Sequence, residues 1–138
     1  VSGADIVFDC APLFEERLLL NRECVRQKKP LVDAAMFEME GQLTTIIPGQ
    51  TPCLACLYPE VPPGWKREFP VLGAVSATMA NLAALEGLKL LAGFGELLTS
   101  KLLIFDARSM DFRKIAIAPR PGCPVCSLRP LPADQGHP

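Results

Sequence analysis

Histidine is almost absent from this chain of 138 residues, and its single copy, His137, stands next to the C-terminus. A Ser–His or Cys–His nucleophile pair needs a histidine beside the nucleophile, and a histidine in the tail offers none. The sequence also lacks the glycine-rich GxGxxG loop and the Walker phosphate-binding loop, whose backbone amides cradle phosphates. These absences exclude histidine-assisted nucleophilic catalysis and leave no phosphate-binding loop within these residues.

An excess of charge and long apolar runs are also lacking. The net charge at pH 7 is −1, which provides no electrostatic attraction to nucleic acid or to an anionic membrane. No apolar stretch reaches the roughly 18 residues of a membrane span, and we expect no signal peptide, because no basic segment precedes an apolar run at the start. We therefore expect a cytoplasmic protein with reduced thiols and with neither a nucleic-acid nor a membrane partner.

Hydrophobic residues make up 49% of the chain, enough for a real core. The length suits about one domain, which we assign to residues 1–127. Residues 128–138 form a polar, proline-containing tail that we expect to be disordered. Because the chain opens on Val1 and runs almost directly into an apolar strand, we also expect it to be a fragment.

Apolar patterning predicts an α/β fold with a mixed sheet and flanking helices. A strand, a helix and a second strand occupy residues 6–36, a unit that makes the two strands parallel. The helix at 73–91 is apolar nearly all round, so we expect it inside the domain or in a subunit interface. The predicted elements are strands at 6–10, 31–36, 42–47, 101–106 and 112–118, the last two an antiparallel hairpin, helices at 12–28 and 73–91, and an irregular loop at 48–70.

Four of the six cysteines form two Cys-x-x-Cys pairs, Cys53 with Cys56 and Cys123 with Cys126. Two such pairs are typical of a closed tetrahedral zinc site with a structural role. Iron in the same cage, or two disulfides in a secreted protein, are the alternatives. A metal here ties the loop at 48–70 to the end of the domain. The remaining cysteines, Cys10 and Cys24, lie among apolar neighbours, and we expect both to be buried.

Acidic side chains offer one candidate ligand position. Asp9 ends the first predicted strand, and open α/β sheets bind ligands beyond the carboxyl ends of their strands. Asp9 is equally suited to cap the helix that follows. Asp33 and Glu38 are isolated acids near turns, and we expect both to be solvated.

Read together, these segments resemble the ThiF/MoeB/HesA family, the prokaryotic relatives of ubiquitin-activating enzymes. The shared motifs occur in family order and cover nearly the whole chain. They are DC followed by R-x-x-x-N (Asp9, Cys10, Arg17, Asn21), KPLV (29–32), EGQ (40–42), PC-x-x-CLYPE (52–60), LEGLKLLAGFG (85–95), KLLIFDA (101–107) and RPGCPVC (120–126).

The resemblance implies the C-terminal half of a Rossmann-like, ATP-binding fold that works as a homodimer. Such enzymes use MgATP to adenylate the C-terminal glycine of a ubiquitin-like sulfur-carrier protein that ends in Gly-Gly. Asp9, Arg17 and Asn21 are the positions that the resemblance assigns to the nucleotide. The family's glycine-rich loop and basic phosphate contacts belong upstream of residue 1, so we expect these residues alone to be inactive.

Two features depart from the family pattern. The family usually reads D-C-x-D-N at the strand end, and its second Asp helps to hold MgATP, whereas this chain has Pro12 and Leu13 there. The loop also has no cysteine near Lys66 for a covalent link to the carrier. The alternative function is therefore a catalytically degenerate, zinc-bearing binding or dimerisation module of the same family.

Overall fold

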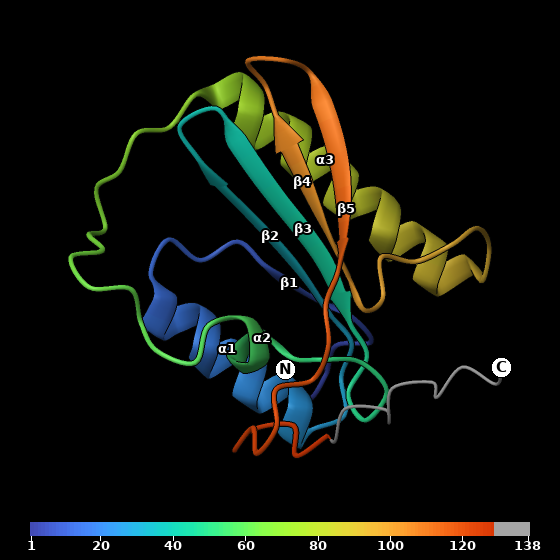
Figure 1. Cartoon of the computed structure of the whole chain (residues 1–138). Helices are drawn as coiled ribbons and strands as arrows, with labels where there is room; N and C mark the ends of the chain where they lie inside the picture. Colours follow the sequence, from blue (N-terminus) through green and yellow to red (C-terminus); the bar gives the residue numbers. More distant parts are fainter. Residues whose placement is uncertain (129–138) are drawn as a thin grey trace, which may run out of the picture.

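A five-stranded mixed sheet with helices on both faces forms the part of the chain that the computed structural model describes, residues 1–128 (Figure 1). The strand order is β1-β2-β3-β4-β5, with β1 and β2 parallel and every later pair antiparallel. The predicted fold class is thus confirmed. The elements are β1 (Val7–Asp9), α1 (Phe14–Arg26), β2 (Leu31–Phe37), β3 (Glu40–Ile46), α2 (Leu54–Leu57), α3 (Gly73–Ala92), β4 (Lys101–Asp106) and β5 (Asp111–Ala116).

Two apolar clusters fill the two sides of the sheet. Successive side chains of a strand point to opposite faces, and the neighbours Leu31 and Val32 accordingly belong to different clusters. Leu31 packs with α1, α2 and the Cys-x-x-Cys segments, whereas Val32 packs with α3. Strand β2 is therefore covered on both faces, which explains its near-continuous apolar sequence.

Helix α1 begins two residues later than expected. Leu13 is still extended, with φ −107° and ψ 141°, and Pro12 lies in the connection that precedes it. The helix then buries Arg17, Asn21 and Cys24. These three residues are spaced at i, i+4 and i+7, so they share one face, and that face is mostly polar.

The loop at 48–70 is not irregular throughout, because α2 forms a single helical turn inside it. Two other expectations about this region and its surroundings were wrong. Cys10 is exposed, although Cys24 is fully buried as expected. Asp33 is buried at 4% exposure rather than solvated. The expected disordered tail falls almost wholly on residues outside the described range.

Helix α3 has the predicted position and buries one side, against β2 and β3. The other side leaves Leu85, Leu88 and Leu91 each more than half exposed, at 52%, 55% and 65%. Gly93 ends the helix in the left-handed region, with φ 69°, a conformation that costs glycine little. A place for this helix in a subunit interface stays a prediction. Within residues 1–128, no helix combines the length and the apolarity needed to cross a membrane.

Glu86 fixes α3 to the sheet from inside the protein. Its side chain is 2% exposed. One carboxylate oxygen accepts hydrogen bonds from the Thr45 hydroxyl at 2.6 Å and the Leu98 backbone N–H at 2.8 Å. The other oxygen forms an ion pair with Lys89. A buried carboxylate is tolerated when its lone pairs are satisfied in this way.

Replacing Glu86 with alanine should lower the free energy of unfolding by about 3 kcal/mol, since it opens a cavity and leaves the Thr45 hydroxyl and Leu98 N–H buried without an acceptor. Urea denaturation measures the change. The control is Asn81→Ala on the exposed side of the same helix, where we expect a change within about 0.5 kcal/mol. Equal effects of the two substitutions would show that Glu86 is not an anchor.

Candidate functional site

The four cysteines of the two Cys-x-x-Cys pairs converge at one point. Their sulfur atoms all lie within 4.8 Å of one another. The Cys53 and Cys123 sulfurs are 3.8 Å apart, and those of Cys56 and Cys126 are 3.5 Å apart. A tetrahedral zinc with Zn–S bonds of roughly 2.3 Å places its sulfurs about 3.8 Å apart. The arrangement therefore fits a metal ion, and none of these thiols is in a disulfide.

Short turns hold each pair in place. Cys53 immediately precedes α2, and the Cys56 N–H donates to the Cys53 carbonyl oxygen at 2.9 Å. In the second pair, the Ser127 N–H donates to the Cys123 carbonyl oxygen at 3.1 Å. Both turns aim two sulfurs at a common centre, as a four-thiolate site requires.

Burial and backbone amides act on these thiols in opposite directions. Burial raises the pKa of the Cys53 thiol to about 12. Burial also acts to raise the pKa of Cys123, but the backbone of Cys126 and Val125 and the thiols of Cys56 and Cys126 together lower that pKa to about 7. A cation at the centre would favour the thiolate form of all four ligands.

A second cluster lies at the end of β1, beside the middle of β2. The guanidinium of Arg17 donates from Nη2 to Asp33 Oδ1 at 2.8 Å and to the Ala34 carbonyl oxygen at 2.9 Å. Its Nε lies 3.4 Å from Asp9 Oδ2. Asp9 Oδ1 accepts from the Ala11 N–H at 2.9 Å, so Asp9 stabilises the turn before α1 and faces Arg17 at the same time.

Two carboxylates thus share one guanidinium inside the protein. Burial raises the pKa of Asp33 to about 7, and the nearby Asp9 adds to that rise, whereas Arg17 opposes it. The pKa of Arg17 is itself raised, because the two carboxylates outweigh the effect of burial. Arg17 therefore stays charged, and Asp33, with a pKa of about 7, takes up a proton near neutral pH.

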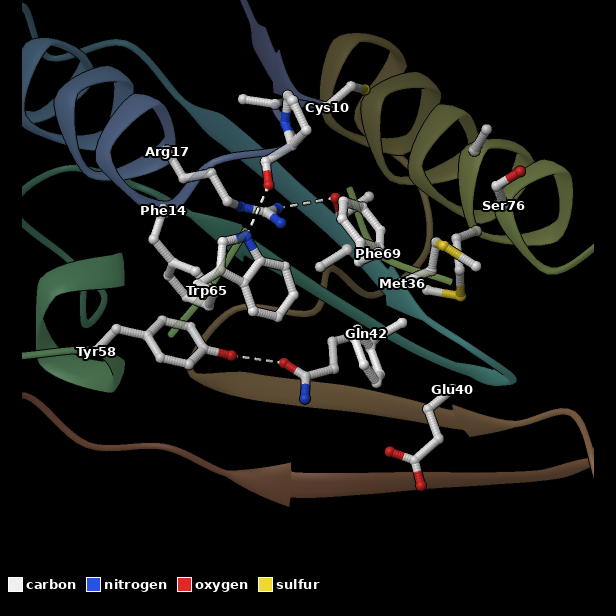
Figure 2. A pocket seen from close by; sticks show the side chains of 17 residues that line it. Cys10, Phe14, Arg17, Met36, Glu40, Gln42, Tyr58, Trp65, Phe69 and Ser76 are labelled. Atoms are coloured by element: carbon white, nitrogen blue, oxygen red, sulfur yellow. Dashed lines mark hydrogen bonds between the residues drawn. The ribbon is translucent and has the colours of Figure 1, made fainter. Parts of the chain in front are cut away.

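A pocket of about 410 Å³ opens beside this cluster, between the start of α1, the far end of β2, the loop and the start of α3 (Figure 2). Strand β1 pairs only with Leu31–Asp33 of β2. The remainder of β2, Ala34–Phe37, is part of the pocket wall. The floor is therefore a strand edge that β1 leaves open, and Arg17 stands at one end of it.

Aromatic side chains from distant parts of the chain form the outer wall. The Trp65 indole N–H donates to the Pro12 carbonyl oxygen at 2.9 Å, which closes the loop over the start of α1 (Figure 2). Phe14 packs edge-on against both Trp65 and Tyr58, with ring centroids 4.9 and 5.1 Å apart. The Tyr58 hydroxyl donates to Gln42 Oε1 at 2.7 Å and joins this wall to β3.

The residues predicted from sequence separate into two places. Cys53, Cys56, Cys123 and Cys126 meet at the candidate metal centre. Asp9 and Arg17 meet at the end of β1, and Arg17 also lines the pocket. Asn21 is fully buried and accepts from the Leu54 N–H at 2.9 Å, so it lies at the helical turn between Cys53 and Cys56.

Sequence reasoning missed Asp33, Tyr58 and Trp65 as site residues. For Asp33 a signal existed, because it follows two apolar residues in a strand parallel to the one that Asp9 ends. In a parallel pair such positions are adjacent, and Asp9 is indeed paired with Asp33. Tyr58 belongs to the PC-x-x-CLYPE motif, but nothing local places Tyr58 or Trp65 in a pocket, because their partners are far away in the sequence.

Comparison with known proteins gives one family. The sequence profile of the ThiF family matches residues 1–125. The HesA protein of Nostoc sp. is 54% identical over 126 residues, which cover 91% of this chain and 50% of HesA. The adenylyltransferase and sulfurtransferase MOCS3 of Drosophila yakuba is 43% identical over 136 residues, which cover 95% of this chain and 30% of MOCS3. The chain thus spans about half, or less, of the length of the curated relatives it matches.

Solved structures show the same fold. Escherichia coli MccB with ATP superposes with a TM-score of 0.75 at 20% identity, over 91% of this chain and 40% of MccB. The microcin C7 biosynthetic enzyme MccB in complex with N-formylated MccA gives a TM-score of 0.75 at 21% identity, over 89% and 41%. At such low identity the likeness concerns the architecture of the chain.

The carboxylate pair should make stability depend on pH. An Asp whose pKa is about 7 when folded and about 4 when unfolded binds more protons in the folded state between those values. The free energy of unfolding therefore falls as pH rises through this window, by about 1.4 kcal/mol from pH 6 to pH 8. Urea denaturation at both pH values measures the fall.

Asp33→Asn removes the titrating group and should abolish most of that fall, whatever it does to stability at one pH. The exposed Asp111→Asn variant should keep the wild-type dependence. A fall of the same size in Asp33→Asn and in the wild type would assign the effect to other groups.

Proposed function

Because this chain belongs to the ThiF family, we propose that it is the C-terminal part of a longer ATP-dependent enzyme that adenylates the C-terminal glycine of a ubiquitin-like sulfur-carrier protein. Its limited share of HesA and MOCS3 favours a longer parent. MOCS3 is named an adenylyltransferase and sulfurtransferase, and MccB has been solved with ATP and with MccA. These names support nucleotide chemistry on a protein or peptide substrate.

The pocket along the open edge of β2 carries the proposal. An extended peptide can add to an exposed strand edge through main-chain hydrogen bonds, and Ala34–Phe37 provide such an edge inside a pocket of about 410 Å³. A Gly-Gly tail has no side chains to fit, so a narrow space between β2 and the Trp65 wall suits it. In this arrangement the tail would run along β2 with its carboxylate toward Arg17.

The nucleotide would lie next to the Arg17 end of the open edge of β2. Of the three residues proposed for it, Arg17 lines the pocket and Asp9 lies behind Arg17, whereas Asn21 is further away along α1. When bound, MgATP supplies the activated α-phosphate. The protein's task is to hold the tail carboxylate in line with that phosphate and to neutralise charge. Arg17 would act here as a hydrogen-bond donor to the tail carboxylate, because Asp33 and Asp9 offset its charge.

Zinc is the metal that we propose for the four cysteines. Four thiolates without an open coordination position are typical of structural zinc, so the ion stabilises the fold and takes no part in adenylation. The reduced thiols that it needs are in keeping with the cytoplasm. Homodimerisation remains part of the proposal, and the exposed leucines of α3 are a candidate contact surface.

Pro12 favours the alternative function, a binding or dimerisation module that has lost catalysis. Proline has no side-chain group that binds a metal–nucleotide complex, and here its carbonyl oxygen already accepts the Trp65 indole N–H. Such a module would keep the carrier pocket and the zinc but would not activate the carrier.

The test of function is ATP–pyrophosphate exchange by the complete protein. We expect exchange that depends on a Gly-Gly-ending carrier encoded near the gene, and no exchange with a carrier that lacks the last glycine. Carrier binding without exchange, measured by calorimetry, would favour the module. Neither binding nor exchange with any such carrier would reject both functions.

The Trp65→Ala variant, measured in the same exchange assay, tests whether the pocket binds the carrier. The substitution removes the bond to Pro12 and the packing on Phe14, so the KM for the carrier should rise about tenfold, equal to roughly 1.4 kcal/mol, while the KM for ATP changes less than twofold. Phe112→Ala, exposed on β5, is the control and should leave both constants unchanged. An equal rise for both substrates would show that Trp65 acts on the fold as a whole.

Metal content tests the zinc centre. We expect about one zinc per chain by elemental analysis, and Cys123→Ser should lose the metal and several kcal/mol of stability, because structural zinc contributes folding energy directly. Cys24→Ser changes an equally buried thiol outside the cluster and should retain the metal. A metal-free wild-type protein that stays folded with disulfides would contradict the site.

A further inference from the structure

We propose that Asn21 is a positioning residue of the four-cysteine metal centre, where its side-chain amide donates to the sulfur of Cys53 and its carbonyl oxygen holds the turn that carries Cys53 and Cys56. This inference rests on the proposed metal centre. It places on Asn21 a role at the metal, distinct from the nucleotide role that the family resemblance implies.

The first observation is the position of the carbonyl end. Asn21 is 0% exposed, and its Oδ1 accepts the Leu54 N–H at 2.9 Å. Leu54 is the first residue of α2 and follows Cys53 directly. Helix α2 has only four residues, too few to be stable through its own hydrogen bonds. Asn21 therefore satisfies a free N–H at the start of this turn and fixes the turn to α1, beside which it lies (Figure 1).

The second observation concerns the other end of the same side chain. Asn21 Nδ2 is buried and has no hydrogen-bond partner in the described part of the protein. A buried amide N–H without an acceptor lowers stability by about 1–3 kcal/mol. An asparagine at this position therefore needs a physical reason. The other end of this amide holds the N–H of Leu54, the residue directly after Cys53, so the free amide N–H lies close to Cys53 in the metal centre. A thiolate is a stronger acceptor than a thiol, and a metal-bound Cys53 would complete the bond.

The third observation is the charge that the centre has to carry. Four thiolates and one divalent ion leave two negative charges in a largely buried place, and N–H donors to sulfur disperse that charge. Cys53 is 0% exposed, and there the donor comes from a side chain of α1.

The position of Asn21 on α1 follows from helical geometry. Residues four apart lie on one face of a helix, and Arg17 stands four residues before Asn21. The same face of α1 thus contacts β2 through Arg17 and the metal centre through Asn21. Asn21 aligns α1 on the metal centre, and α1 in turn holds Arg17 at the pocket.

Two substitutions in the complete, zinc-loaded protein test the proposal. Asn21→Leu removes both polar ends at similar volume, and Asn21→Asp keeps an acceptor for the Leu54 N–H but loses the amide donor. Loss of an outer partner of a metal ligand typically costs 10–100-fold in metal affinity. We therefore expect both variants to transfer zinc to a coloured chelator at least about tenfold faster than the wild type. Circular dichroism verifies that each variant is folded.

Thr45→Val is the matched control. Thr45 is also 0% exposed and also makes a buried side-chain hydrogen bond, to Glu86 on the opposite side of the sheet. It should lose stability without a change in the rate of zinc release at temperatures where the protein is folded. Two results would overturn the proposal. One is faster zinc release from all three variants in proportion to their loss of stability. The other is a rate of zinc release from both Asn21 variants within twofold of the wild-type rate.

Cobalt provides a readout of the sulfur contact itself. In the Co²⁺-loaded protein the sulfur-to-metal charge-transfer bands should move to lower energy in Asn21→Leu, because an N–H bond to sulfur stabilises the sulfur electrons, and should be unchanged in Thr45→Val. If the charge-transfer bands of Asn21→Leu have the wild-type energy, the contact between Asn21 and the Cys53 sulfur is rejected, but the metal centre is not. A wild-type protein that binds neither zinc nor cobalt at these cysteines would reject the metal centre and this role together.

Discussion

The guanidinium of Arg17 is the contact on which the geometry of the pocket depends. It binds Asp33 and the Ala34 carbonyl on β2 and faces Asp9 on β1, so one side chain fixes the end of β1 and the middle of β2 to α1. A buried charge flanked by two carboxylates is stable only as a set, because removal of one member leaves another uncompensated. This cluster therefore fixes the start of α1 relative to β1 and β2. It fixes one end of the pocket in the same way.

The four cysteines connect parts of the chain that lie further apart in the sequence than the residues of the Arg17 cluster. One pair belongs to the turn that enters the proline-rich loop, and the other follows β5 at the end of the sheet. A metal that joins them fixes the beginning of the loop, so that Tyr58 and Trp65, downstream of Cys56, reach the pocket from a defined starting point. The Arg17 cluster and the metal centre thus hold the two sides of one pocket, and α1 contacts both.

Local patterns in the sequence were sufficient for the elements and for the cysteines. The strand–helix–strand unit, the long α3 and the final hairpin have strong periodicity or clear boundaries, and the spacing of Cys53, Cys56, Cys123 and Cys126 is specific enough to predict that they meet. Helix α2 is too short for any periodicity to be visible. The burial of Asp33 depends on Arg17 arriving from α1, and the aromatic wall joins Phe14, Tyr58 and Trp65, so neither follows from neighbouring residues. Cys10 is exposed because β1 ends at Asp9 and the chain turns toward the pocket.

The bond between the Trp65 indole and Pro12 has a practical consequence. Trp65 is the single tryptophan of the 138 residues, and its ring lies in the wall of the pocket against Phe14 and Phe69. Indole emission responds to polarity and to hydrogen bonding at the N–H. Within this part of the protein, intrinsic fluorescence therefore reports on one place alone, and the arrival of a ligand in the pocket can be followed in real time without any attached dye.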